Sequence, residues 1–147
     1  MIEITVLAVV ALAVLTVGFL LRRHGGKVRA AHVTAASGST RAGQLTAVGM
    51  TGDGPAIVHF SAEWCGPCEA VRRVVANVTD QLAQSPRPPQ DIEVDIDAEP
   101  ALARELNVLS LPTTFVFDAE GTERFRISGV PKATDLRSAV ESLTTAA

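Results

Sequence analysis

Two cysteines separated by two residues are the side chains of this chain best suited to chemistry. They are the only cysteines among 147 residues, and they lie in the segment Trp64-Cys65-Gly66-Pro67-Cys68. A Cys-x-x-Cys pair that follows an apolar strand and opens a helix is typical of reversible thiol–disulfide exchange. The apolar run from Ala56 to Phe60 predicts that strand, and the run from Cys68 to Leu82 predicts that helix.

The two cysteines are predicted to have different roles because they differ in their place on the helix. Cys65 is expected at the helix N-terminus, where unpaired N–H groups and the helix dipole favour the reactive thiolate. Cys68 is expected one turn further in and less exposed, close enough to attack a mixed disulfide. We therefore predict that Cys65 is the nucleophile and Cys68 the resolving thiol. Pro67 has no N–H to lose in the first turn, and Gly66 lets a substrate backbone come close.

A metal site is the main alternative use for a pair of cysteines. A structural zinc site usually needs four protein ligands. Only three histidines, His24, His32 and His59, could complete one, and they are scattered along the chain. The Gly-Pro between the cysteines also argues against an inert buried pair, so we predict no metal.

The segment from Trp64 to Cys68 resembles the active site of the thioredoxin family. The likeness includes the tryptophan before the first cysteine and the Gly-Pro between the two, which makes it more specific than a bare Cys-x-x-Cys. The resemblance implies an enzyme that reduces protein disulfides and forms a Cys65–Cys68 disulfide in doing so. It also implies that the domain binds no cofactor, and that a thioredoxin reductase or an equivalent dithiol supplies the electrons. Trp64 is expected to form an apolar shelf beside the sulfurs.

Alternating and helical patterns predict a regular succession of elements around this segment. Strands are expected at 56–61, 91–97, 113–117 and 123–127. Helices are expected at about 65–83 and 100–106, and Leu136, Val140 and Leu143 mark the inner face of a last helix. Two β-α-β crossovers followed by a hairpin and a helix predict an α/β sheet covered by helices. The order also resembles the thioredoxin fold, which implies a central mixed β-sheet flanked by helices.

A second segment resembles the loop that faces the cysteines in the thioredoxin family. Leu111-Pro112-Thr113 directly precedes a predicted strand, and the resemblance implies a cis peptide bond before Pro112. It further implies that the backbone of Leu111 pairs with the substrate chain. Gly129 matches a family glycine that lets a partner approach the site, although an ordinary turn glycine would look the same.

Among the positions that differ from the family pattern, two concern the proton of Cys68. His59 stands six residues before the first cysteine, where thioredoxin has a buried acid that manages the proton of the second cysteine. The lysine that usually accompanies this acid corresponds to Glu93. We therefore predict proton transfer to and from Cys68 by His59, oriented by Glu93, since histidine is suited to proton exchange near neutral pH. The alternative is a neutral histidine in the core with Glu93 turned to solvent.

The amino-terminal segment is predicted to be a membrane anchor. Residues Ile4 to Leu21 carry no charge, and with Ile2 and Glu3 the run covers 20 residues, which is about 30 Å as a helix and enough to cross a bilayer. A cleavable signal peptide would have a basic leader, a shorter core and a small-residue cleavage site. The leader here contains neither Lys nor Arg, so we expect an uncleaved transmembrane helix ahead of the α/β domain.

The charges around this helix predict its orientation. Arg22, Arg23, Lys27 and Arg29 follow the apolar run, whereas Glu3 is the only charged side chain before it. An excess of Lys and Arg marks the cytoplasmic side of a membrane. We therefore predict a single-pass protein of the cell membrane with its catalytic domain in the cytoplasm. The absence of further cysteines agrees with a reducing compartment.

The chain is predicted to have three regions. These are the anchor at 1–21, a basic juxtamembrane segment and tether at 22–54, and the thioredoxin-like domain at 55–147. The family's first strand and helix, which the domain itself does not match, have to come from residues 28–50. The domain contains eight Lys/Arg against fourteen Asp/Glu, a net charge of −6, which excludes ordinary nucleic-acid binding because phosphate contacts need clustered cations.

Two other functions stay open from the sequence. The same fold could face outward and act on exported proteins or apocytochromes, with electrons delivered across the membrane. It could also be an interaction module that recruits partners to the membrane. The intact segment from Trp64 to Cys68 argues against this module, because binding alone does not require both thiols.

Overall fold

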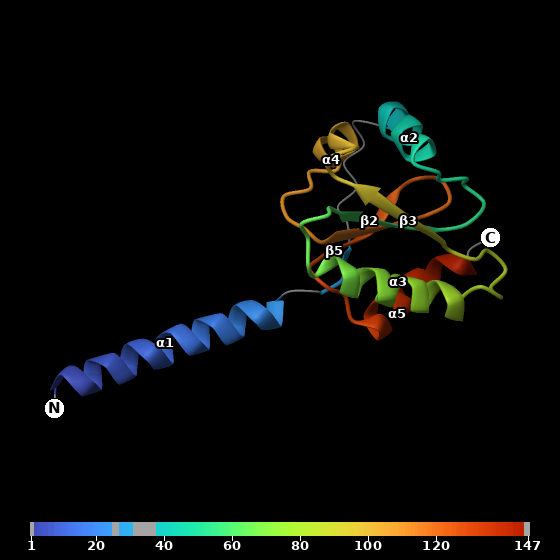
Figure 1. Ribbon diagram of the computed structural model, residues 1–147. Helices are drawn as coiled ribbons and strands as arrows, with labels where there is room; N and C mark the ends of the chain where they lie inside the picture. Colours follow the sequence, from blue (N-terminus) through green and yellow to red (C-terminus); the bar gives the residue numbers. More distant parts are fainter. Residues whose placement is uncertain (1, 25–26, 31–37, 146–147) are drawn as a thin grey trace.

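A five-stranded β-sheet with helices on both faces forms the body of the protein (Figure 1). The computed structural model describes residues 2–24, 27–30 and 38–145. In chain order the elements are α1 (Ile2–His24), β1 (Arg29–Ala30), α2 (Gly38–Ala47), β2 (Ala56–Ser61), α3 (Cys68–Gln81), β3 (Gln90–Asp95), α4 (Pro100–Glu105), β4 (Thr113–Phe117), β5 (Glu123–Ser128) and α5 (Ala133–Thr144). From β2 onward this is the order predicted from the sequence.

The sheet is mixed, as predicted, with the strand order β1-β5-β4-β2-β3. The pair β2–β3 is parallel and the other three pairs are antiparallel. The end of β2 therefore lies beside the end of β3, the start of β4 and the end of β5. We call this end of the sheet the cysteine edge, because Cys65 and Cys68 follow β2 directly.

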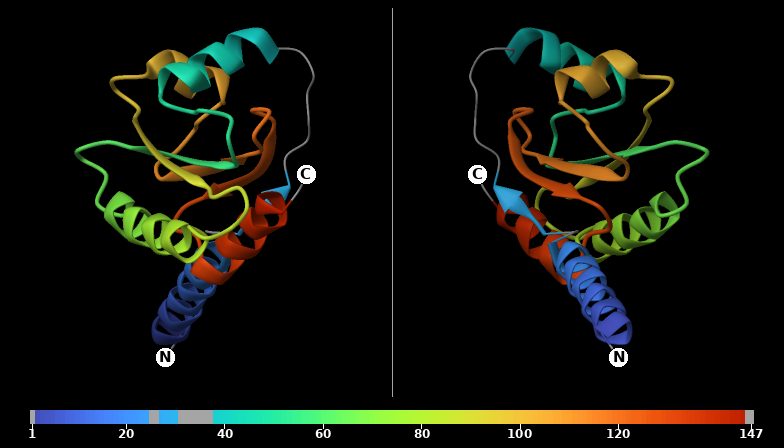
Figure 2. Two further views of the ribbon diagram at one scale, coloured as in Figure 1. Left: turned by 90° about the vertical axis from the view of Figure 1, so that its right-hand side faces the viewer. Right: turned by 90° about the vertical axis from the view of Figure 1, so that its left-hand side faces the viewer.

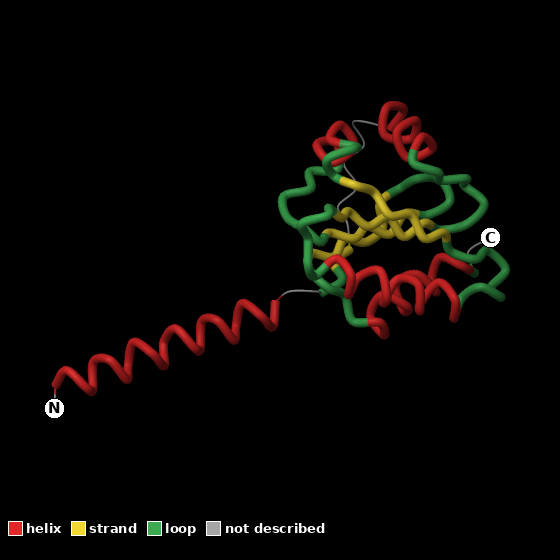
Figure 3. Tube along the Cα trace, in the orientation of Figure 1, coloured by secondary structure: helices red, strands yellow, loops and turns green. Residues whose placement is uncertain are grey.

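Helices lie on both sides of the sheet (Figures 2 and 3), and an apolar core fills the space on each side. One core joins α2 and α4 to the face of the sheet that carries Val58, Phe60 and Phe115. The other joins α3 and α5 to the opposite face, which carries Ile57 and Val116. Side chains alternate along a strand, so a central strand covered on both faces is a continuous apolar run. That pattern is why β2 could be predicted to the residue.

Helix α3 begins at Cys68, the first residue of the run Cys68 to Leu82 and three residues after the start of the range 65–83 expected for this helix. Its helical spacing of apolar residues holds, because Val71, Val75 and Val78 are all fully buried. Pro67 occupies the N-cap position. The N–H of Cys68 bonds to the carbonyl oxygen of Cys65 at 3.2 Å, so Cys65 lies in the turn that leads into the helix rather than inside it.

The segment from 22 to 54 contributes β1 and α2. β1 covers Arg29–Ala30 at the edge of the sheet, within residues 28–50, from which the first strand and helix were expected; residues 31–37 lie outside the described residues. α2 ends before Gly49, which has a positive φ of 105°, and the N–H of Met50 bonds back to the carbonyl oxygen of Leu45 at 3.0 Å. A left-handed glycine with such a bond is a common way to end a helix.

Helix α1 extends away from the body of the protein (Figure 1). It has 23 residues, and its described apolar side chains are exposed, with Leu7 70% and Leu15 69% exposed. Within the part of the chain that the structure describes, no helix combines the length and the apolar character that crossing a membrane requires. The transmembrane helix expected from the sequence therefore stays a prediction.

Candidate active site

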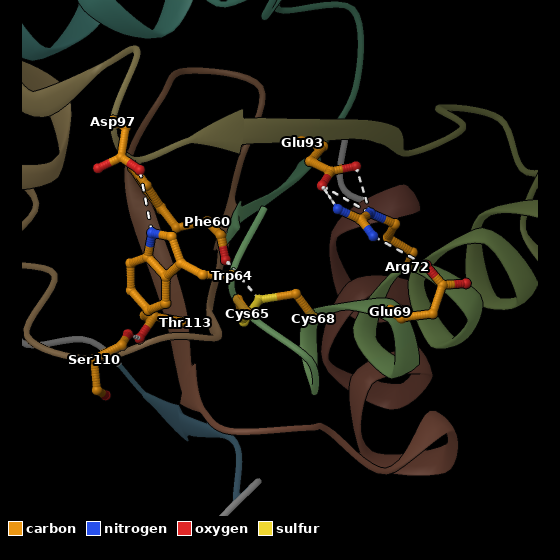
Figure 4. Close-up of a disulfide and its surroundings, with 10 residues drawn as sticks. All are labelled: Phe60, Trp64, Cys65, Cys68, Glu69, Arg72, Glu93, Asp97, Ser110 and Thr113. Atoms are coloured by element: carbon orange, nitrogen blue, oxygen red, sulfur yellow. Dashed lines mark hydrogen bonds and ion pairs between the residues drawn. A yellow bond between two sulfur atoms is a disulfide. The ribbon is translucent and has the colours of Figure 1, made fainter. Parts of the chain in front are cut away.

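The two cysteines form a disulfide at the cysteine edge (Figure 4). Their Cα atoms are 5.5 Å apart. Cys65 lies in the turn after β2, and Cys68 is the first residue of α3. The unpaired N–H groups and the positive end of the α3 dipole therefore lie next to the sulfurs, where they favour negative charge on a thiolate.

The two sulfurs differ in their access to a partner. Cys68 is only 1% exposed and Cys65 is 9% exposed. The Sγ of Cys68 lies 3.9 Å from the carbonyl oxygen of Phe60, on the inner side of the disulfide. Of the two sulfurs, that of Cys65 is therefore the more accessible to a substrate, and the roles assigned to the two cysteines stay a prediction.

The loop before β4 packs against the disulfide. The Leu111–Pro112 peptide bond is cis, as the resemblance implied. Leu111 packs against the small apolar cluster that both cysteines form with Ala62. The N–H of Gly129 bonds to the carbonyl oxygen of Pro112 at 2.8 Å, and Gly129 has a positive φ of 84°. The structure thus brings Leu111, Pro112 and Gly129 to the same edge as the disulfide.

Trp64 stands at the rim of the site and is 72% exposed. Its indole Nε1 donates a hydrogen bond of 3.3 Å to Oδ2 of Asp97, in the loop that follows β3 (Figure 4). This bond fixes the nitrogen-bearing edge of the indole, while the rest of the exposed ring offers an apolar surface beside the cysteines. Asp97 has no motif of its own, and the sequence analysis missed its role.

Arg72 links the start of α3 to β3. Its guanidinium contacts Glu93 at 2.7 Å and Glu69 at 2.9 Å (Figure 4). Hydrogen bonding to Glu93, and then to Glu69, raises the pKa of Arg72. The hydrogen bond from Arg72 lowers the pKa of the Glu93 carboxyl against a smaller opposing effect of burial. A cation four residues after Cys68 is thus held in place by two carboxylates.

The predicted contact between His59 and Glu93 is wrong. Nε2 of His59 lies 3.0 Å from Oδ1 of Asp91, although the strand register sets His59 opposite Glu93. The carboxylate of Glu93 instead forms an ion pair with Arg72 of α3. Asp91 is two residues earlier on the same face of β3, and its carboxylate takes the place predicted for Glu93. His59 itself is buried, with 2% of its surface exposed.

Replacing Glu93 with glutamine is expected to lower the stability of the fold at neutral pH and to change it little in acid. The lowered pKa of Glu93 means that the folded state holds the charged form more strongly than the unfolded chain does. That contribution is present above the unfolded value of about 4.3 and is lost as the pH falls through the lower folded value. The difference in urea midpoint between the variant and the parent should therefore shrink below about pH 4.

Glu63→Gln is the matched control for this prediction, because Glu63 is an exposed carboxylate that belongs to no ion pair among the described residues. Its effect on the midpoint should be small at every pH. A Glu93→Gln effect of equal size at pH 3 and pH 7 would show that the ion pair with Arg72 is not its cause.

The predicted site residues are therefore mostly brought together. The cysteine edge brings together the two cysteines, Trp64, the Leu111–Pro112 loop and Gly129. Glu93 instead pairs with Arg72 and not with His59. Sequence reasoning missed Asp91, Asp97 and Arg72. The alternation of carboxylates along β3 and the helical spacing of Cys68 and Arg72 were the signals that could have found two of them.

A family model described as Thioredoxin matches residues 45–142 of this chain. A thioredoxin of Mycolicibacterium smegmatis is 39% identical over 94 residues, which cover 60% of this chain and 79% of that protein. A bifunctional thioredoxin reductase/thioredoxin of Mycobacterium leprae is 33% identical over 89 residues, but these cover only 19% of that longer protein.

Solved structures are similar as well. A mutant thioredoxin from Halobacterium salinarum superposes with a TM-score of 0.59 at 27% identity, over 70% of this chain and 85% of that one. A chloroplastic thioredoxin z gives a TM-score of 0.57 at 25% identity, over 68% of this chain and 88% of that one. In each case the likeness leaves part of this chain unmatched.

Proposed function

Since the chain belongs to the thioredoxin family and is a thioredoxin-like disulfide oxidoreductase, we propose that it is a membrane-anchored reductase of protein disulfides. Cys65 is the nucleophile and Cys68 the resolving thiol. The observation that carries this assignment is the unequal access to the two sulfurs at the start of α3, with Cys65 at the rim and Cys68 enclosed.

The reaction has two exchange steps. The Cys65 thiolate attacks one sulfur of the substrate disulfide, which forms a mixed disulfide and releases the other substrate sulfur as a thiolate that takes up a proton. Cys68, once deprotonated, attacks the Sγ of Cys65 and releases the second substrate thiol. The substrate gains two electrons and two protons, and the protein leaves with the Cys65–Cys68 disulfide that the structure shows.

The oxidised protein must then be reduced by another dithiol. We propose a thioredoxin reductase as the donor, supported by the relative in which the two activities occur in one chain. Substrates are proteins with an accessible disulfide, which would lie against Trp64 and pair with the backbone of Leu111. With a thioredoxin reductase and NADPH, the full chain in detergent should reduce a model protein disulfide over many cycles. Failure of the reductase to reduce Cys65–Cys68 would overturn this choice of donor.

We propose that His59, oriented by Asp91, accepts the proton of the Cys68 thiol. His59 lies on the face of β2 that α3 covers, since Ile57, two residues earlier, packs against Val71 and Val75. Asp91 shares a hydrogen bond with Nε2, so it would orient the imidazole. His59 would accept the proton that Cys68 must lose before it attacks the mixed disulfide.

Replacing Asp91 with asparagine is expected to move the pH profile of disulfide reduction, because the carboxylate that orients the His59 imidazole is removed. His59→Gln should slow the reaction by at least about tenfold and flatten the same profile. Rates would be measured from pH 6 to pH 9. Asp80→Asn, at the far end of α3, is the control and should leave the profile unchanged. An unchanged profile in both Asp91→Asn and His59→Gln would rule out this proton route.

The anchor is supported by the sequence and by the exposure of α1. Residues Ile4 to Leu21 carry no charge, and the described apolar side chains of α1 remain exposed. An exposed apolar surface of this size marks a site that a membrane or another apolar partner covers, and we propose the membrane because the uncharged run is long enough to cross it. The basic residues that follow, from Arg22 to Arg29, favour a cytoplasmic domain.

Side-specific labelling of Cys65 and Cys68 tests this orientation. Intact cells would be treated with a reductant and then a maleimide that cannot cross membranes, beside a permeabilised sample. We expect labelling only after permeabilisation. Labelling in intact cells would overturn the cytoplasmic orientation and favour an extracytoplasmic enzyme supplied with electrons across the membrane.

A further inference from the structure

The direction in which the chain enters the sheet determines which end of the domain faces the anchor. β1 pairs antiparallel with β5, with Arg29 opposite Arg126 and Ala30 opposite Phe125. Since β5 ends at the cysteine edge, β1 must begin there. The residues just before Arg29 therefore come level with the last residue of β5, Ser128.

The same register connects this point to the cysteines. Ser128 is opposite Thr113, and Thr113 is opposite Phe60, near the end of β2. Three strand spacings of about 4.8 Å separate β1 from β2, so the chain enters within about 15 Å of the strand that leads to Cys65. Figure 1 shows α1 meeting the body on the side where α3 begins.

The connection between anchor and sheet is short. Four residues, 25–28, separate the last residue of α1, His24, from Arg29, and five peptide units span at most about 18 Å. Val28 already packs against the apolar core beneath α3 and α5. The far edge of the sheet, at the β4–β5 turn, is about 20 Å further along the strands. To turn that far edge toward the surface from which α1 emerges, the connection would have to be almost fully extended, so the cysteine edge is the end that stays near this surface.

The cysteine edge also carries apolar surface. Among the described residues outside α1, the large apolar side chains counted as exposed are Trp64, Leu109 and Val130. Trp64 adjoins Cys65, Leu109 lies in the loop before Pro112, and Val130 follows Gly129. All three belong to loops at the cysteine edge, beyond the end of β2, the start of β4 and the end of β5. The exposed apolar side chains of the described domain therefore gather at the edge nearest the anchor.

We propose that the anchor holds the cysteine edge toward the bilayer, so that the substrates are disulfides of membrane-embedded or membrane-bound polypeptides close to the surface. The inference rests on the proposed anchor, but it adds an orientation that anchoring alone does not require. A long tether would let the domain reach disulfides at any height and in any direction. The short connection restricts it to partners beside its own helix and raises their effective concentration.

Energy transfer in liposomes tests the orientation. The full chain, with Cys65→Ser and Cys68→Ser, would carry one donor dye at Leu109→Cys on the cysteine edge or at Glu120→Cys in the β4–β5 turn, with acceptor dyes on lipid headgroups. We expect higher transfer from position 109 than from position 120. Equal or reversed transfer in protein that floats with the liposomes would overturn the orientation alone. Protein that does not float would overturn the anchor and this inference with it.

A tether insertion tests the consequence for substrates. A Gly/Ser stretch of about 20 residues between Gly25 and Gly26 extends the reach by about 25 Å on average. The parent protein in liposomes should reduce a lipid-attached disulfide peptide faster than the same peptide free in solution. We expect the insertion to lower that preference at least about threefold while leaving the rate on the free peptide unchanged. An equal preference in both proteins would contradict the proposal.

Discussion

Replacing Cys65 with serine is expected to lower the rate of protein-disulfide reduction by at least about 10³-fold, to the uncatalysed background. A serine hydroxyl is not ionised at neutral pH and does not exchange with disulfides. Cys68 cannot substitute for it, because only 1% of Cys68 is exposed and its sulfur lies against the carbonyl oxygen of Phe60. The rate would be measured with a protein disulfide and a dithiol donor in excess.

Cys68→Ser is the matched variant, since it keeps the more accessible thiol and removes the enclosed one. It should react once and stop at a covalent complex in which Cys65 is joined to the substrate. Mass spectrometry of the trapped complex identifies the joined residue. Turnover by Cys65→Ser, or a trapped complex joined through Cys68 in that variant, would reverse the assigned roles.

Replacing Phe115 with alanine is expected to lower the free energy of unfolding by about 3–5 kcal/mol. Phe115 is fully buried in the central strand β4. Its ring lies edge-on to Phe60 at 5.8 Å and stacks with Phe117 at 6.0 Å, and the guanidinium of Arg126 lies 4.6 Å from its centre. The substitution leaves a cavity among rigid neighbours beneath α2 and α4. Urea unfolding of the full chain in detergent, followed by circular dichroism, gives the difference.

Phe125→Ala is the control for this loss of packing. Phe125 lies one strand away on the opposite face and is only partly buried, so less apolar surface returns to water and a smaller cavity forms. We expect a smaller loss of stability. An equal or larger loss for Phe125→Ala would show that the core beneath α2 and α4 does not dominate the stability of the sheet.

The central strands could be predicted because a short apolar run bounded by turn residues is typical of a strand covered on both faces. β2 and β4 are apolar runs covered on both faces, and the structure places them at the predicted residues. The start of α3 was harder, because Cys65 and Gly66 have no pattern that separates a helical turn from the turn before it. β1 has only two residues, and its place at the sheet edge comes from pairing with β5 rather than from any signal of its own.

The site shows the same division between local and long-range information. The cysteines and the cis bond before Pro112 follow from local motifs, and both are as predicted. The predicted partner of His59 was wrong because Arg72, on another element, pairs with the Glu93 carboxylate. His59 then contacts the other nearby carboxylate of β3, Asp91. An ion pair between two elements cannot be predicted from the sequence of one strand alone.

The electron balance of a single turnover tests the central claim most directly. The full chain would be reduced, freed of reductant and mixed with an equal amount of a protein that contains one disulfide, and thiols on both would be counted by alkylation and mass spectrometry. The account predicts that the substrate gains two thiols while the chain loses two, with Cys65 and Cys68 joined to each other at the end. A substrate that keeps its disulfide beside fully reduced Cys65 and Cys68 would contradict it.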